Sequence, residues 1–184
     1  MSKEKLTQGV IGILTSGDDV VFLPLPEEDY LSEADGGKGK KERGEEDHPI
    51  WTSLKAGMLG FVSGKVKTDQ NLKNISEEER KLILENALKR EALEEFGLDV
   101  VPDIENQEKI FDSGVMEQIR YGKEIKFLLW VVTRLLIHED QLEELKKAMD
   151  VVVVKKDDLL EFLENERENI RPAARQAILK SVDL

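Results

Sequence analysis

The chain has 184 residues, of which 40% are hydrophobic and 36% charged, a length and composition typical of one globular domain. Acidic residues outnumber basic ones by 39 to 27, and the net charge of -12 disfavours general binding to nucleic acid or to an anionic membrane. The absence of cysteine excludes a disulfide framework and a thiolate nucleophile, and with only two histidines a histidine-built metal site is not expected.

The chain begins with a predicted β-hairpin. Residues 9–25 contain two β-branched runs separated by Ser16-Gly17-Asp18-Asp19, and glycine and aspartate at these positions favour a tight turn. Residues 26–49 lose all periodicity and are interpreted as a flexible insertion. Four basic residues in it could contact a polyphosphate, but nine acidic residues surround them, so a solvated loop is the favoured interpretation.

A long helix dominates the middle of the chain. Residues 50–67 contain short apolar pieces around glycines, which indicates strands and tight loops. Ser76 and Glu79 form a capping-box pattern, and the apolar periodicity that follows predicts a helix from about residue 77 to residue 96. Gly97 is placed to end this helix in a left-handed conformation.

The C-terminal half alternates predicted strands and helices. Residues 109–116 and 125–136 favour two strands joined around Tyr121-Gly122, the second apolar enough to be central in a sheet. A helix over 139–149, a strand over 151–154, a helical turn over 157–162 and a closing helix from Pro172 towards residue 182 follow. The fold class is therefore α/β (α+β), with a mixed sheet covered by helices.

An acidic stripe on the long helix is the most informative feature of the sequence. At 100° per residue, Leu88, Glu91 and Glu95 lie within roughly 40° of Leu84, so two carboxylates continue an apolar stripe. Leu82, Leu93 and Phe96 predict a second apolar face, and hence packing on two sides. Together with Glu94, the two acids form a like-charged group that a divalent cation would stabilise, and oxygen ligands of this kind suit Mg²⁺.

These residues carry a resemblance to a known family. The string Arg90-Glu91-Ala92-Leu93-Glu94-Glu95-Phe96-Gly97-Leu98 resembles the second half of the Nudix box, R-E-U-x-E-E-x-G-U, where U is apolar. Upstream, Gly64-Lys65-Val66 is similar to the glycine, lysine and apolar residue that begin the box. The resemblance covers most of the chain outside residues 26–49 and implies a single domain with an α/β/α sandwich.

The sequence departs from the family pattern in the loop of the box. Gly64 and Arg90 lie 26 positions apart where the pattern has 14, so we expect an extended loop at about residues 67–76. The first glutamate of the box is missing, because the corresponding positions are Gln70 or Leu82, depending on the direction of counting. Three nearby acids could replace it: Glu78, Glu79 and Glu85.

The resemblance also implies an activity and roles for single residues. Glu91, Glu94 and Glu95 would bind Mg²⁺, or Mn²⁺ in its place, near the Gly64 carbonyl, while Arg90 would orient a glutamate. The implied reaction is hydrolysis of a pyrophosphate linkage, X-P-O-P-Y, in a nucleoside diphosphate linked to another group. Lys65 would contact phosphate. The general base stays open between Glu91 and an acid outside the box, and the candidates there are Glu117 and Glu139.

The sequence is also compatible with two other functions. A catalytically silent Nudix-like module could bind a nucleotide or a protein, and an acidic scaffold would bind no small ligand. Trp51 is the aromatic residue to test first for contact with a nucleotide-derived substrate. The apolar run over residues 127–136 would suit either a core strand or a homodimer interface. The first ten residues lack the apolar core of a signal peptide, and no membrane span is visible, so we expect a cytoplasmic protein.

Overall fold

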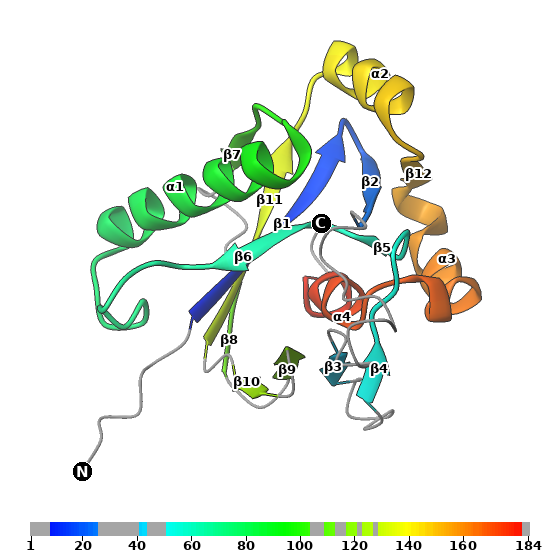
Figure 1. Cartoon of the computed structure of the whole chain (residues 1–184). Helices are drawn as coiled ribbons and strands as arrows, with labels where there is room; N and C mark the ends of the chain where they lie inside the picture. Colours follow the sequence, from blue (N-terminus) through cyan, green and yellow to red (C-terminus); the bar gives the residue numbers. More distant parts are fainter. Residues whose placement is uncertain are drawn as a thin grey trace.

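A mixed eight-stranded β-sheet with helices on both faces forms the main body of the computed structural model (Figure 1). The structure describes residues 8–25, 41–43, 51–103, 109–112, 117–120, 123–126 and 129–181, and side chains within 8–25, 54–103 and 131–181. The strands of the main sheet are β1 (Gln8–Ser16), β2 (Asp19–Pro24), β5 (Leu59–Gly60), β6 (Val62–Lys65), β7 (Val101–Asp103), β8 (Lys109–Asp112), β11 (Leu129–Leu136) and β12 (Val152–Lys155).

The strand β1 lies at the centre of this sheet. The order is β12-β2-β1-β11-β7, and β6, β5 and β8 extend it by pairing with β1, β2 and β11. β1 and β11 run parallel in register from Gln8 opposite Leu129 to Thr15 opposite Leu136, whereas the other pairs of this sheet are antiparallel. β6 therefore lies beside β1, with Gly64 opposite Val10.

Within the described residues, four helices cover the two faces of the sheet: α1 (Glu77–Phe96), α2 (Glu139–Ala148), α3 (Leu159–Asn165) and α4 (Pro172–Lys180). Short 3₁₀ turns, η3 (Lys156–Asp158) and η4 (Arg167–Asn169), flank α3. No helix in the described part of the chain is both long and apolar enough to cross a membrane.

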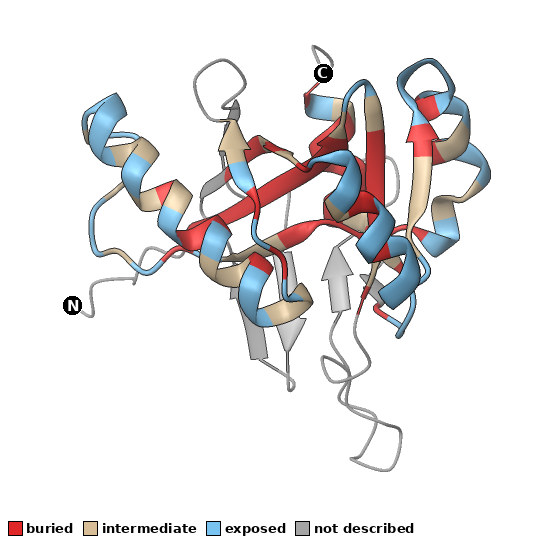
Figure 2. Cartoon of the chain, turned by 90° about the horizontal axis from the view of Figure 1, so that it is seen from above, coloured by how far each residue is buried: buried red, intermediate tan, exposed pale blue. Residues whose placement is uncertain are grey.

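Alternation along β1 divides the core into two layers. Val10 and Leu14 pack on one face in a cluster that includes buried residues of α1 and α2. Ile11 and Ile13 pack on the opposite face with buried residues of α3 and α4. Figure 2 shows the buried residues along the strands and the exposed ones on the outer sides of the helices. The architecture is an α/β/α sandwich, which confirms the expected fold class.

A second, smaller sheet contains four short strands in the part of the chain that the structure describes. They are β3 (Lys41–Arg43), β4 (Trp51–Ser53), β9 (Glu117–Arg120) and β10 (Lys123–Lys126), in the order β10-β9-β3-β4. Residues 41–43, which form β3, belong to the region predicted as a flexible insertion. The rest of the insertion lies outside the described residues.

The local signals around the long helix are confirmed. α1 begins after Ser76, whose hydroxyl accepts a hydrogen bond from the Glu79 amide at 3.2 Å. It ends at Gly97, which has φ of 65° and donates its amide to the Leu93 carbonyl at 3.0 Å. The predicted hairpin also forms, as β1 and β2 pair with Ser16 opposite Asp19.

The strands predicted over 109–116 and 125–136 pair as expected, since β8 is antiparallel to β11. Between them, β9 and β10 pair in the smaller sheet with Arg120 opposite Lys123, so this region is divided between two sheets, and Tyr121-Gly122 lie outside the described residues. One prediction about α1 is wrong, because Leu82 and Leu93 of its expected second apolar face are 59% and 64% exposed. The described part of α1 buries only the stripe that contains Leu84, Ala87, Leu88 and Ala92.

Candidate functional site

The contact between β6 and α1 brings Gly64 and Glu91 together. An ideal Cβ built on Gly64 would lie 2.1 Å from Cδ and 2.5 Å from Oε1 of Glu91. A real Cβ would therefore overlap the carboxylate, and only glycine lets the Glu91 side chain lie across the strand at this point. The two residues, one from each half of the sequence motif, form a single contact at the edge of the core.

Arg90 joins the helix to the same strand. Its Nη2 donates to the Lys65 carbonyl at 3.0 Å and pairs with Oε1 of Glu91 at 2.5 Å. This ion pair is partly exposed, and its hydrogen bond to a carboxylate is of the strong, charge-assisted kind. Arg90 thereby fixes the orientation of Glu91 relative to the strand that carries Gly64. The buried Nε of Arg90 has no acceptor among the described atoms.

A glutamine outside the motif holds the loop between β6 and α1. The buried side chain of Gln8 accepts a hydrogen bond from the Leu72 amide at 2.8 Å and donates one to the Gln70 carbonyl at 2.7 Å. Its own carbonyl accepts from the Val66 amide at 2.9 Å. The loop of residues 66–76 is therefore fixed to the first residue of β1, and Leu72 is buried in the core. The sequence pattern contained no signal for Gln8, because the two partners of its side chain lie 62 and 64 positions away.

The three glutamates of the motif have different environments. Glu91 is partly buried against Gly64, Glu94 is exposed, and Glu95 is partly buried at a pocket. Within the described residues, no group of three or more histidine, cysteine, aspartate or glutamate side chains lies close enough to hold a metal ion. Glu94 lies three positions after Glu91 and directly before Glu95 on the last turns of α1, and its side chain is exposed to solvent.

The remaining site candidates are spread over the chain. Lys65 is exposed next to Gly64, and Glu139 is exposed at the first position of α2. Glu78 and Glu79 lie in the first turn of α1, at the opposite end of the helix from Glu95, whereas Glu85 is partly buried near its middle. The side chains of Glu117 and Trp51 lie outside the described residues.

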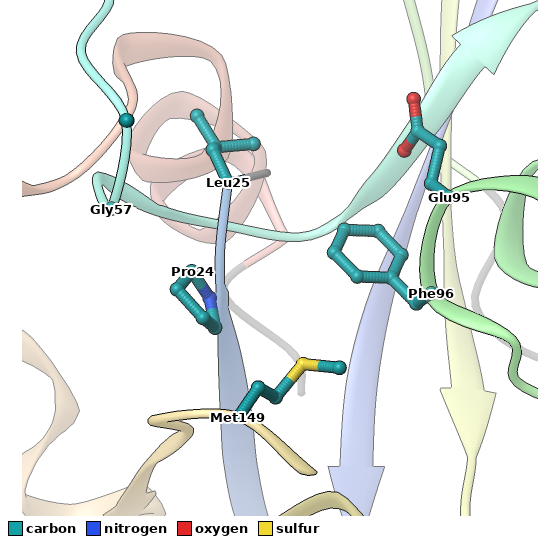
Figure 3. A pocket seen from close by; sticks show the side chains of 7 residues that line it. Pro24, Leu25, Gly57, Glu95, Phe96 and Met149 are labelled. Carbon is teal, nitrogen blue, oxygen red and sulfur yellow. The ribbon is translucent and has the colours of Figure 1, made fainter. Parts of the chain in front are cut away.

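An open pocket of about 400 Å³ lies beside Glu95. Figure 3 shows Phe96 between Glu95 and Met149, with Pro24 and Leu25 facing them from the end of β2. Ala56 and Gly57, in the turn before β5, complete the described lining. Except for Glu95, these lining side chains are apolar. The pocket lies within the size range of small-molecule sites.

A buried arginine supports β6 from the opposite face of the sheet. Arg171, immediately before α4, donates from its amide to the Leu59 carbonyl at 2.8 Å and from Nη1 to the Ser63 hydroxyl at 3.2 Å. Ser63 is adjacent to Gly64, so α4 and α1 both hold the short segment that contains the site. Sequence reasoning did not find Arg171, because nothing near it in the chain indicates its partners.

Comparison of the sequence with protein-family models and with curated proteins finds no match.

Proposed function

We propose that the chain is a Mg²⁺-dependent hydrolase of the Nudix type that cleaves a pyrophosphate linkage in a nucleoside diphosphate linked to another group. The observation that carries this proposal is the seating of Glu91 against Gly64 with Arg90 bonded to both the strand and the carboxylate. Two parts of the sequence that resemble the ends of one motif are thus in contact, although 26 positions separate Gly64 from Arg90.

The donor set fits a hard divalent cation. Glu91 and Glu95 are four positions apart on one helix face, where Cβ atoms are roughly 5 to 6 Å apart, and carboxylate oxygens are the ligands that Mg²⁺ prefers. Glu91 uses Oε1 for Arg90, which leaves its second oxygen for the cation. Because Mg²⁺ is commonly held by one or two carboxylates together with water and substrate phosphates, a cluster of three acids is not required. Glu94 and the Gly64 carbonyl remain proposed ligands, and Mn²⁺ is an alternative cation.

The residues of the site have separate roles in the proposed reaction. When bound, the cation supplies a Lewis acid that neutralises charge on the diphosphate and makes water more acidic. Arg90 holds the Glu91 carboxylate in one orientation through its Nη2. Lys65 is exposed beside Gly64, so its ammonium group can attract the phosphates.

Hydrolysis requires one proton transfer from water. A water oxygen bonds to one phosphorus, the bond from that phosphorus to the bridging oxygen breaks, and the second phosphate leaves with the bridging oxygen. A carboxylate of the chain takes the proton of the attacking water. Glu91 is the proposed base that lies at the site, while Glu139 and Glu117 remain the proposed alternatives outside the motif.

A catalytically silent binding module is the second candidate function. It is favoured by the missing first glutamate of the box and by the extended loop between Gly64 and Arg90. In such a module Glu91 would stabilise the contact of α1 with β6 without taking part in a reaction. A protein with this function would bind a nucleotide with unchanged covalent structure.

The decisive experiment compares the wild-type chain with Glu95→Gln. The substrates are ADP-ribose, dinucleoside polyphosphates, NADH, nucleotide sugars and nucleoside triphosphates, each with Mg²⁺ or Mn²⁺. We expect cleavage of at least one of them and a loss of more than about 10-fold in the variant, since even residues behind a metal ligand contribute about 10- to 100-fold.

Glu144→Gln is the matched control. It removes the same negative charge as Glu95→Gln, but at an exposed position on α2 away from the site. Equal turnover by the wild type and Glu95→Gln would refute the role of Glu95. Specific Mg²⁺ binding in isothermal titration without any hydrolysis would favour the silent module, and no specific binding would favour the acidic scaffold.

A further inference from the structure

We propose that the pocket beside Glu95 holds the organic half of the diphosphate substrate by apolar contact, and that the preferred substrates carry an apolar aromatic group there. This inference rests on the proposed function, because it assigns the diphosphate to the Glu91 and Glu95 end of α1. It adds a substrate class to that function and names the residues that would select it.

The lining residues favour an apolar occupant. Leu25, Phe96 and Met149 present aliphatic, aromatic and thioether surfaces to an open pocket of about 400 Å³ (Figure 3). A thioether and an aromatic ring both make favourable contacts with a flat ring. Removal of such a ring from water is itself favourable, so the pocket can bind it without a directional polar contact.

The same lining offers few groups that could identify a nucleobase by hydrogen bonds. Among the described lining side chains, only Glu95 carries a polar group. The amide of Leu25 already donates to the Met58 carbonyl at 2.9 Å, the amide of Gly57 donates to the Leu25 carbonyl at 3.1 Å, and Pro24 has no amide hydrogen. A buried nucleobase edge would leave its donors and acceptors unpaired here, which disfavours binding.

The position of Glu95 connects the pocket to the proposed reaction. Glu95 and Phe96 are consecutive on the last turn of α1 and both line the pocket, so a cation bound by Glu95 would lie at the pocket itself. Met149 lies on the far side of Phe96 from Glu95 (Figure 3). A diphosphate held near Glu95 can therefore extend an attached ring over Phe96 towards Met149.

The first test compares two small diphosphate esters in the presence of Mg²⁺. The esters are 1-naphthyl diphosphate and methyl diphosphate, which share the phosphates and differ in the apolar group. We expect at least about tenfold tighter binding of the naphthyl ester, because burying a ring removes considerably more apolar area from water than burying a methyl group. Equal affinity for the two esters in isothermal titration would overturn the inference.

The second test locates the ring by NMR. The chain contains four methionines, and ¹³C-methyl labelling with Met149→Leu as the assignment variant identifies the Met149 signal. We expect the naphthyl ester to shift this signal, whereas the methyl ester leaves it within a small fraction of that shift. A naphthyl ester that binds without moving the Met149 signal would show that the ring occupies another place.

A pair of tryptophan variants tests whether the aromatic group binds in this pocket. Ala56 lines the pocket and is exposed, so Ala56→Trp fills the space with little effect on the core, and we expect the preference for the naphthyl ester to fall at least tenfold. Lys55→Trp adds the same side chain one residue away, at an exposed position outside the described lining, and should keep the preference. An unchanged preference in Ala56→Trp would contradict the proposed location.

The outcomes separate this inference from the proposed function. Cleavage of diphosphates without a shift of the Met149 signal would support the proposed hydrolase function and refute the assignment of the pocket to the aromatic group. A shift of the Met149 signal without cleavage of any diphosphate would support an apolar ligand site at the pocket and refute the proposed hydrolase function.

Discussion

The contact of Gly64 with Glu91 leaves no room for a methyl group on the strand. We predict that Gly64→Ala displaces the Glu91 side chain, because the new Cβ would lie 2.1 Å from Cδ of Glu91. Overpacking of this kind costs about 1 to 3 kcal/mol of folding free energy, and the displaced carboxylate should also weaken Mg²⁺ binding. Denaturant unfolding and isothermal titration measure the two effects.

Gly60→Ala provides a matched control on the neighbouring strand. A Cβ there would meet Cδ2 of Leu25 at 3.5 Å, which is an ordinary van der Waals contact. Its effect on stability should be clearly smaller, and Mg²⁺ binding should be unchanged. If Gly64→Ala and Gly60→Ala behaved alike, the close approach of Glu91 would have no energetic importance.

The residues of the motif could be identified from the sequence, whereas their partners could not. The resemblance to the Nudix box implies that Arg90 pairs with a glutamate, and Arg90 pairs with Glu91 in the structure. The hydrogen bond from Arg90 to the Lys65 carbonyl depends on the approach of α1 to β6. Such an approach depends on long-range packing, which no local pattern encodes.

At the scale of elements, α1 packs against the sheet on one side. Leu88 is fully buried and Leu93 is 64% exposed, although five positions of the same helix separate them. We predict that Leu88→Ala costs about 2 to 5 kcal/mol, while Leu93→Ala stays within about 0.5 kcal/mol of the wild type. Equilibrium unfolding in urea compares the two variants directly, and similar losses would mean that the outer side of α1 is covered in solution.

The hydrogen bonds of the Gln8 side chain hold the loop of residues 66–76 against β1. Gln8→Ala removes the partners of two backbone groups, the Leu72 amide and the Gln70 carbonyl. The hydrogen bond of the Leu72 amide is buried, and leaving such a group unpaired costs about 1 to 3 kcal/mol, so hydrogen exchange of this amide should also accelerate. Gln70→Ala is the control, since its side chain is exposed and its carbonyl is retained.

Elements with local signals could be predicted, and those that depend on partners could not. Ser76 and Gly97 mark the ends of α1 through the conformations of single residues, so both ends agree with the prediction. In the described part of residues 109–136, β8 pairs with β11 in the main sheet and β9 pairs with β10 in the smaller one, and no signal in the sequence marks this division between two sheets. The apparent second face of α1 fails for a related reason, because a helical pattern shows which residues share a face but not whether another element covers it.

At the scale of the whole molecule, the net charge of -12 acts against an anionic ligand. We predict that diphosphate binding depends steeply on a divalent cation, since without one the chain repels the phosphates. Isothermal titration of methyl diphosphate should show binding with Mg²⁺ and none with a chelator at matched ionic strength. Retention of the same affinity in the chelator would contradict the cation requirement.

The layered architecture can be predicted from composition and from the alternation of strands and helices. The order of the strands in the sheet cannot. Alternating strands and helices predicted a mixed sheet between helices, which the structure has. The placement of β6 beside β1, and of Arg171 beneath Ser63, depends on how the chain crosses the sheet. No single motif determines these crossings, because they result from many weak packing preferences along the whole sequence.

The parallel pairing of β1 with β11 has a consequence for the order in which the molecule assembles. The Thr15 hydroxyl donates to the Leu135 carbonyl across 120 positions of sequence, so the central strand cannot gain this neighbour until most of the chain has been synthesised. Until then, an apolar strand keeps one edge unpaired. Closing so long a segment makes folding slow, and the waiting strand is the place where a nascent chain would need protection from aggregation.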